Sequence, residues 1–292
     1  MAQSAREIKR RISSIASTQQ ITKAMEMIAA VKLRKAQAEV LNTRPFFQRL
    51  GASLAAVIEA AHKAGDPLPE IARSRPGKKH CLILFTSDRG LAGGYNAAII
   101  REAEAFLRKH PDTELVILGR KARDHFRRRS QTFLAEFINL GDEPTLRQAQ
   151  EIGQVVYDFY AHELFDRVTI LYTKFINTVT HKAEYRHILP VVRPEADQKT
   201  AAEMLNALYI YEPSINAVLE ALLPLYVDAA VYQSLVEAKA SEFGARMTAM
   251  RNASDNADEL IRELNLTFHR ARQAMITKEI AEIVGGADAL EA

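Results

Sequence analysis

The longest regular pattern in the chain is a stripe of apolar and small residues that recurs at alternating steps of four and three positions. Its members are Phe243, Met247, Met250, Ser254, Ala257, Ile261, Leu264, Phe268, Ala271 and Met275. This spacing is typical of a coiled-coil seam, and its mean period of about 3.5 residues makes a helix supercoil left-handedly around a neighbour. A second helix is therefore needed, either from another copy of the chain or from elsewhere in the same sequence.

The N-terminal residues predict such a helix. Ser4 and Glu7 have capping-box spacing, and neither Gly nor Pro follows before Pro45. The apolar residues fall on two faces, with Ile8, Ile12 and Ile15 on one and Ile21, Met25 and Ile28 more than half a turn away. We expect this helix to present different faces to its partner along its length. Pro45 should kink or end it before an amphipathic continuation over 46–62.

Between the two helical regions the hydrophobic period changes. A linker rich in Gly and Pro covers 65–77, and the following residues predict strands over 81–86, 115–118, 132–140, 167–175 and 184–189. Helices are predicted over 95–109, 120–128 and 145–165. This order favours an α/β layer whose sheet is mostly parallel and has an antiparallel edge.

A second linker, 190–200, leads to the C-terminal helical region. Pro213 and Pro224 should divide its start into short pieces, and from 225 to 284 only Gly244 interrupts the pattern before a stop at Gly285 and Gly286. If the chain is a monomer, an inserted domain forces the terminal helices to run antiparallel. We predict an α/β fold with an antiparallel two-helix coiled coil formed by both termini, with domains at 1–62, 78–190 and 207–286.

Composition restricts the class of protein. The net charge is +3 and the sole cysteine, Cys81, has no partner for a disulfide, which favours a reducing compartment. The N-terminus has no apolar core of a signal peptide, and Glu220, Pro224 and Asp228 interrupt the most apolar stretch, 218–232. We expect a soluble chain that can still dock on a membrane assembly.

Basic residues concentrate near the N-terminus. Residues 1–44 contain nine Lys or Arg and three Glu, a balance of 9 − 3 = +6. This excess indicates either a solvated helix face or a basic surface that binds acidic loops of a partner. A second basic cluster consists of Lys121, Arg123, Arg127, Arg128 and Arg129. No stacking aromatics surround it, so a solvated face is favoured over nucleic-acid binding.

The stretch 87–96, SDRGLAGGYN, follows a predicted strand and precedes a helix, where α/β folds bind phosphates. Its glycines do not have the spacing of a dinucleotide-binding or P-loop motif, and Asp88 would repel a phosphate. We therefore expect a tight turn that presents Asp88 and Arg89 to a protein partner. The eight histidines are scattered without metal-ligand spacing, and no nucleophile motif is recognisable.

Near the C-terminus, polar and apolar residues alternate after the seam should have lost its partner. The polar ones are Arg272, Gln273, Thr277 and Glu279, and the apolar ones are Met275, Ile276, Ile280 and Ile283. Solvated polar positions explain the first group. A helix tip packed inside a partner better explains why an apolar stripe continues here.

Several motifs together resemble one family. ITKAMEM at 21–27, SDRGLAGGYN at 87–96 and RARQAMIT at 270–277 look like the γ subunit of F-type ATP synthase, bacterial type, and the similarity extends over the whole chain. The resemblance implies a Rossmann-like α/β domain inserted between two coiled-coil helices that stand in a hexamer of α and β subunits. It implies a rotor shaft that couples proton-driven c-ring rotation to ATP synthesis.

The resemblance also implies which residues contact partners. Contacts with the α/β hexamer are expected at Lys23, Met25, Asp88, Arg89, Arg246, Arg272, Gln273 and Thr277, and contacts of the foot with the c-ring and the ε subunit at Tyr209 and Glu212. Ala92 replaces a cysteine found in many relatives, and the 190–202 linker lacks the insertion of photosynthetic γ subunits, so thiol regulation of the chloroplast kind is not expected.

The implied protein is a non-catalytic subunit, present in one copy, without a cofactor, metal or nucleic-acid partner. It would lie at the cytoplasmic face of a bacterial plasma membrane and reach the membrane only through the c-ring. The alternative from another class is a nucleotide-dependent α/β enzyme with a coiled-coil dimerisation arm. A coiled-coil RNA-binding protein is a third hypothesis, and it predicts salt-sensitive retention on nucleic acid.

Overall fold

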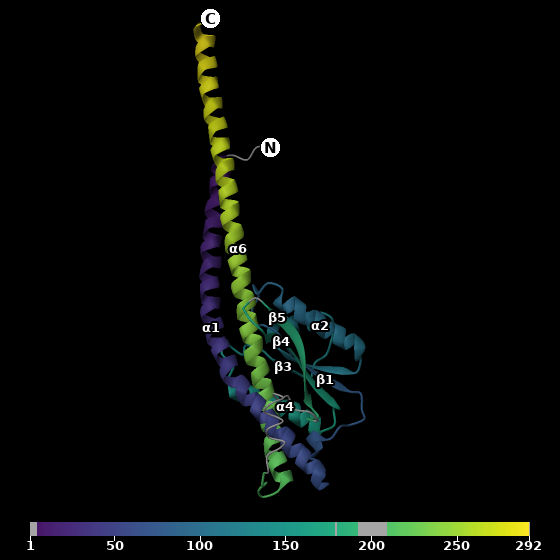
Figure 1. Ribbon diagram of the computed structural model, residues 1–292. Helices are drawn as coiled ribbons and strands as arrows, with labels where there is room; N and C mark the ends of the chain where they lie inside the picture. The colour runs from purple at the N-terminus through teal and green to yellow at the C-terminus, as the bar shows by residue number, and fades with distance from the viewer. Residues whose placement is uncertain (1–4, 179, 192–208, 292) are drawn as a thin grey trace. The chain divides into compact units, whose positions relative to one another are not determined.

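The computed structural model describes residues 5–178, 180–191 and 209–291. Contacts divide the chain into two compact units, one of Met1–Ile28 with Met247–Ala292 and one of Ala29–Arg246. Two long helices, α1 (Ala5–Ala64) and α6 (Ile215–Glu291), contribute residues to both units (Figure 1).

The larger unit contains a five-stranded sheet in the order β3-β2-β1-β4-β5. Its strands are β1 (His80–Phe85), β2 (Thr113–Leu118), β3 (Ala135–Phe137), β4 (Arg167–Phe175) and β5 (His181–Leu189). β5 pairs antiparallel with β4, and the other neighbours pair parallel. The predicted mostly parallel sheet with an antiparallel edge is therefore confirmed. β3 is shorter than the predicted 132–140 because the chain turns at Asn139, whose φ is +58°.

Helices cover both faces of this sheet. Figure 1 shows α2 (Tyr95–Lys109) on the side of the sheet away from α1 and α6. Leu82 and Leu84 of β1 pack there with residues of α2 and of α3 (Arg120–Arg127), whereas Ile83 and Phe85 face α4 (Leu146–Ala161) and the long helices. This division follows from the alternation of side chains along a strand. The core therefore joins the α/β domain directly to α1 and α6.

Neither long helix breaks where proline predicted a break. Pro45 lies inside α1, so of the two predicted outcomes, a kink or an end of the helix, the end does not occur; Pro224 lies inside α6, so the expectation that it divides the last helix is wrong. Both rings lie on exposed surface, where water can bind the carbonyls that lose an amide donor. The stop at Gly285 and Gly286 is also wrong, because α6 continues to Glu291. An exposed glycine costs a helix only about 1 kcal/mol.

Buried polar side chains join α1 and α6 within the larger unit. Thr43 Oγ1 donates to Gln233 Oε1 at 2.6 Å, and Gln233 Nε2 donates to Glu237 Oε1 at 2.9 Å. Arg44 Nη2 donates to the same Glu237 oxygen at 3.1 Å. Farther along, Phe47 stacks on the ring of Tyr226 with centroids 5.4 Å apart. Residue numbers rise along α1 as they fall along α6, so the helices are antiparallel.

The smaller unit consists of the first part of α1 and the last part of α6. Gln19 contacts Asp258 and Glu26 contacts Arg251, which again makes the two helices antiparallel. The seam residues Met250, Ser254 and Ala257 are buried. The seam thus finds its partner in the same chain, and the predicted coiled coil of both termini with an inserted α/β domain is confirmed.

The burial of the seam changes along the helix. Residues Ile261, Leu264, Phe268 and Ala271 are half-buried, and Met275 is 47% exposed. On α1, Ile8 is buried, whereas Ile21 and Ile28 are exposed. Figure 1 shows the C-terminal part of α6 continuing past the start of α1. On the second apolar face of α1, Ile21 and Ile28 are thus left uncovered within this unit, whereas Met25 is half-buried.

One described helix has the length and composition to cross a membrane. Ile215–Val284 of α6 contains an 18-residue window of mean hydropathy 1.4, of which 39% is buried inside the protein. The expectation that charged residues and proline rule out such a window is therefore wrong by this measure. Leu219, Leu223 and Tyr226 of the same helix belong to the core of the larger unit, and a core helix carries the same hydropathy signal.

Candidate partner-binding surfaces

The 87–96 loop is a tight turn, as predicted, and it is held from within. Ser87 is fully buried, and its hydroxyl donates to the carbonyl oxygen of Arg89 at 2.6 Å. Asn96 Oδ1 accepts the backbone amide of Ser87 at 3.0 Å. Leu91 and Gly93 have φ values of +62° and +56°, which reverse the chain between β1 and α2. These contacts give the loop one defined conformation.

Part of this loop packs against α6. Arg246 Nη2 donates to the carbonyl oxygen of Gly90 at 3.2 Å, and Tyr95 Oη donates to that of Ala238 at 3.1 Å. Ala92, Tyr95 and Ala245 form a small apolar cluster between the loop and the helix. Burial raises the pKa of Tyr95 far above its usual range, so its hydroxyl stays protonated and remains a donor. The loop thereby attaches the α/β domain to α6.

Arg246 belongs to a buried charge network. Its guanidinium lies 2.8 Å from Glu242 Oε1, and Lys239 Nζ lies 3.2 Å from Glu242 Oε2. The side chain of Arg246 is only 11% exposed and that of Glu242 only 5%. Sequence reasoning expected Arg246 to contact a partner and did not identify this internal role. The i,i+4 spacing of Glu242 and Arg246 is the sequence feature that could have indicated this ion pair.

Asp88 and Arg89 have different environments. Asp88 Oδ1 accepts the backbone amide of Arg120, the first residue of α3, at 3.0 Å. A carboxylate at a helix N-terminus is stabilised by the orphan amides there. Asp88 is therefore half-buried and engaged in the fold, whereas Arg89 is exposed. Of the two residues expected at a partner surface, Arg89 is the one that the fold leaves accessible.

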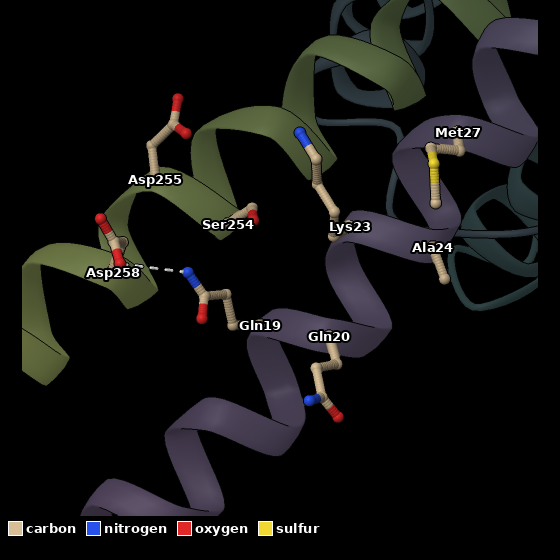
Figure 2. Close-up of a pocket in the computed structure, with 8 residues that line it drawn as sticks. All are labelled: Gln19, Gln20, Lys23, Ala24, Met27, Ser254, Asp255 and Asp258. Carbon is tan, nitrogen blue, oxygen red and sulfur yellow. Dashed lines mark hydrogen bonds between the residues drawn. The ribbon is translucent and has the colours of Figure 1, made fainter.

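In the smaller unit, α1 and α6 border a groove of about 520 Å³ (Figure 2). Its lining includes Gln19, Lys23 and Met27 from α1, and Figure 2 shows the amide of Gln19 reaching across to Asp258, where the two side chains lie 3.4 Å apart. The predicted contact residue Lys23 has an exposed side chain. Met25 is half-buried.

Glu26 organises the charges beside this groove, and sequence reasoning assigned it no role. Lys23 Nζ lies 2.9 Å from Glu26 Oε2, and Arg251 Nε lies 3.0 Å from Glu26 Oε1. The hydrogen bond from Lys23 lowers the pKa of Glu26 below its usual range, burial opposes this shift, and Arg251 adds to it. The carboxylate therefore stays ionised and ties the helices together.

The predicted tip residues Arg272, Gln273 and Thr277 are all exposed. Thr277 Oγ1 donates to the backbone carbonyl oxygen of Gln273 within the helix at 2.9 Å. Large apolar side chains of the same region are also exposed: Met275 by 47%, Ile276 by 41%, Ile280 by 56% and Ile283 by 72%. An apolar surface of this kind commonly marks a binding site.

At the other end of α6, Tyr209 and Glu212 precede the helix and are exposed. The ring of Tyr209 lies 6.3 Å from that of Tyr211, and Ile210 between them is 90% exposed. These residues belong to the larger unit, whereas Lys23 and the tip residues belong to the smaller one. The predicted contact residues are thus divided between the two units.

The basic residues of α3 are largely paired within the chain. Arg123 lies 2.7 Å from Asp124, Arg127 lies 3.3 Å from Glu136, and Arg129 contacts Glu104. This pairing supports the interpretation of a solvated surface. Among the residues that the structure describes, no group of three or more His, Cys, Asp or Glu is arranged to hold a metal ion.

Comparisons with known proteins agree with the resemblance. The sequence model of the family described as ATP synthase matches residues 4–290. The ATP synthase gamma chain of Heliobacterium modesticaldum is 45% identical over 98% of both chains, and that of Moorella thermoacetica is 47% identical over 98% of this chain and 99% of its own. The ATP synthase gamma chain of Symbiobacterium thermophilum is 44% identical over the full length of both.

Solved structures show the same similarity. A chain from the central stalk and c-ring of the Tetrahymena thermophila mitochondrial ATP synthase has a TM-score of 0.63 and 25% identity, covering 80% of this chain and 99% of that one. A chain from the Euglena gracilis mitochondrial ATP synthase has a TM-score of 0.69 and 19% identity over 98% and 94%, which shows the fold alone. This chain therefore belongs to the ATP synthase γ chain family.

Proposed function

We propose that this chain is the central-stalk rotor shaft of an F-type ATP synthase, and that it couples c-ring rotation to ATP synthesis in the β subunits. The observation that carries this proposal is the antiparallel helix pair, tied by Glu26 and Arg251, from which α6 continues with an exposed apolar tip. The membership of the chain in the γ family supports it. The chain itself would be a non-catalytic stalk component.

A shaft can drive its partners only if it binds their conformations differently at each angle, because a ligand shifts an equilibrium by its differential affinity alone. An unsymmetrical helix pair meets this condition. In the smaller unit α1 exposes Ile21 and Ile28, whereas Lys23 and Met27 of α1 and Asp255 and Asp258 of α6 line the groove. An apolar face and a groove lined by charged side chains belong to the same helix pair, so each β subunit would meet a different surface as the shaft turns.

We further propose which surfaces meet which partners. The α and β subunits would contact Lys23, Met25, Arg89, Arg272, Gln273 and Thr277, and Asp88 and Arg246 would support the loop that presents Arg89. The exposed Tyr209 and Glu212 would meet the ε subunit and the c-ring. The functional parts would be 1–62, 78–190 and 207–286. The proposal includes one copy per complex at the cytoplasmic face of a bacterial plasma membrane, and the similarity to bacterial γ chains supports this part of it.

The tip provides the sharpest test. Truncation after Thr267 removes the exposed apolar surface, so the complete complex with the truncated chain, reconstituted in vesicles, should assemble but should pump fewer protons per ATP hydrolysed. A chain truncated after Val284 retains the tip and serves as the control. If both truncated chains pump equally well, the tip has no part in coupling.

Met25→Lys tests a proposed contact residue on α1. Because Met25 is half-buried, the new ammonium group has to reach the surface without a designed partner, and we expect coupled proton pumping to fall more than ATP hydrolysis. Unchanged pumping in vesicles would contradict this expectation. Stoichiometric binding of labelled ATP to the isolated chain at the 87–96 loop would instead favour a nucleotide-dependent enzyme.

A further inference from the structure

The connection between β3 and α4 is built to hold two acidic side chains in place. Arg120 Nη2 donates to Asn139 Oδ1 at 2.7 Å where the connection begins. Gln148 Nε2 donates to the carbonyl oxygen of Leu140 at 3.0 Å, and Thr145 forms a capping box with Gln148 at the start of α4. Both ends are therefore fixed by hydrogen bonds, and Asp142 and Glu143 lie between them.

These two acidic residues bind α1. Asp142 Oδ2 lies 2.6 Å from Lys32 Nζ, and Glu143 Oε1 lies 2.7 Å from Lys35 Nζ. Lys32 and Lys35 are three positions apart and thus lie on one face of the helix. Two neighbouring carboxylates from the α/β domain are therefore matched to two neighbouring ammonium groups on the helix.

Asp142 also faces two further cations. The hydrogen bond from Lys32 lowers the pKa of Asp142, burial opposes that shift, and the positive charges of Lys239 on α6 and Arg89 in the 87–96 loop add to it. A cavity of about 170 Å³ is lined by Asp142, Arg89 and Lys239 together. Cations from α1, α6 and the 87–96 loop thus surround one carboxylate, while Lys239 is itself paired with Glu242.

A second cavity of about 240 Å³ lies under this connection, between α1 and α6. Its lining includes Asp142, Glu143, Lys239 and the ring of Phe243. The acidic residues therefore span a gap that side chains do not fill. Elsewhere in the larger unit the α/β domain meets the long helices through apolar packing around Leu54 and Tyr226. Apolar contacts are non-directional, so ion pairs with defined partners oppose sliding along the helix more specifically.

We propose that Asp142 and Glu143 are positioning residues for coupling: they clamp the α/β domain to α1 so that torque applied to that domain turns the helix pair without slippage. This inference rests on the proposed function. Single exposed ion pairs contribute little, so the effect depends on two pairs presented together from a fixed connection. Asp142 carries the larger share because it faces cations from three parts of the fold.

The test uses the complete complex reconstituted in vesicles. The double variant Asp142→Asn with Glu143→Gln keeps side-chain size and removes both charges, and we expect about a twofold or larger fall in protons pumped per ATP hydrolysed. Arg147→Gln removes an exposed ion pair within α4 and should leave the ratio unchanged. The combination Lys35→Glu with Glu143→Lys reverses the second pair and should pump more protons per ATP hydrolysed than either single reversal does.

Two measurements separate positioning from mere folding. Assembly of the complex and the thermal unfolding midpoint of the isolated chain should differ little between the double variant and Arg147→Gln. If the double variant pumps as wild type does, or if its loss follows lower assembly or stability, the clamp is refuted. A wild-type complex that does not pump at all would refute the proposed function instead.

Discussion

Replacing Arg246 by Met should lower the free energy of unfolding of the larger unit, and the contacts of Arg246 give the size of the loss. The substitution removes a charged hydrogen bond to Gly90, for which about 1.5–3 kcal/mol is typical. It also leaves Glu242, whose side chain is 5% exposed, without its second cation. Stranding a buried charge costs about 3–5 kcal/mol, but Lys239 remains 3.2 Å away and compensates for part of this. We therefore expect a total loss of about 2–4 kcal/mol.

Tyrosine fluorescence gives a selective assay. All nine tyrosines lie between residues 95 and 232, within the larger unit, so urea unfolding followed by their emission reports on that unit alone. Arg147→Met is the matched control, because its side chain is 88% exposed and its pair with Glu151 lies within one helix. That control should lose less than about 0.5 kcal/mol.

A double-mutant cycle identifies the cause. Glu242→Gln removes the stranded charge, so combining it with Arg246→Met should cost less than the sum of the single changes by about 1–3 kcal/mol. If Arg246→Met shifts the unfolding midpoint no more than Arg147→Met does, the buried network does not hold the 87–96 loop on α6, and the reasoning fails.

Three further predictions concern single residues. Gly119→Ala should destabilise the larger unit by about 3 kcal/mol or more, because its φ is +97° and a Cβ there would lie 2.2 Å from the backbone oxygen of Thr86. Gly65→Ala, at a φ of +74° with open space around it, should cost less in the same tyrosine assay. Equal losses of stability for the two variants would contradict this prediction. The folded-state pKa of Glu26 is lowered, so the stability that its carboxylate contributes is present above the unfolded pKa of about 4.3 and is lost as the pH falls through the folded pKa. Glu26→Gln should therefore weaken the loss of the helix signal in circular dichroism at acid pH. The same acid dependence in the variant and the parent chain would refute the pairing. Burial is the main cause that lowers the pKa of His80, and His110 and Arg167 add to the shift. The unfolded chain therefore binds the proton more readily, and stability should fall as the pH drops below about 6.5. His80→Phe should reduce the fall of the urea midpoint between pH 7 and pH 5, and a parent-chain midpoint independent of pH would contradict this prediction.

Local patterns were sufficient for the secondary structure and much of the fold. The predicted bounds of α2 and β4 agree with the structure because each element carries its full hydrophobic period and clear ends. The seam through Met250 and Ala257 was equally readable, since a 3.5-residue period admits only a supercoiled helix pair. Proline was a poor indicator of helix ends, because Pro45 and Pro224 lie on exposed helix surface, where water replaces the lost backbone hydrogen bond.

The candidate surfaces were less predictable. Motif resemblance assigned partner contacts alike to Arg89 and the tip residues, which are exposed, and to Arg246, which is buried in a charge network. Glu26 and Asp142 received no role at all. The partner of Glu26 on α6, Arg251, lies 225 positions away, and Lys32, the partner of Asp142, lies 110 positions away, so no spacing within a motif indicates these two contacts.

The amino-acid sequence by itself therefore determined the helix pair, the mostly parallel sheet and the family, because each depends on periodicity or on short motifs that act over a few residues. Only the tertiary structure decided which charged side chains remain exposed for a partner and which form ion pairs inside the chain. Burial and ion pairing arise between segments that the fold brings close, so Arg246 and Asp142 acquire their roles only when α6, the 87–96 loop and the connection before α4 meet. The exposure of the tip at Ile283 was likewise decided by where α1 begins, not by the sequence of α6.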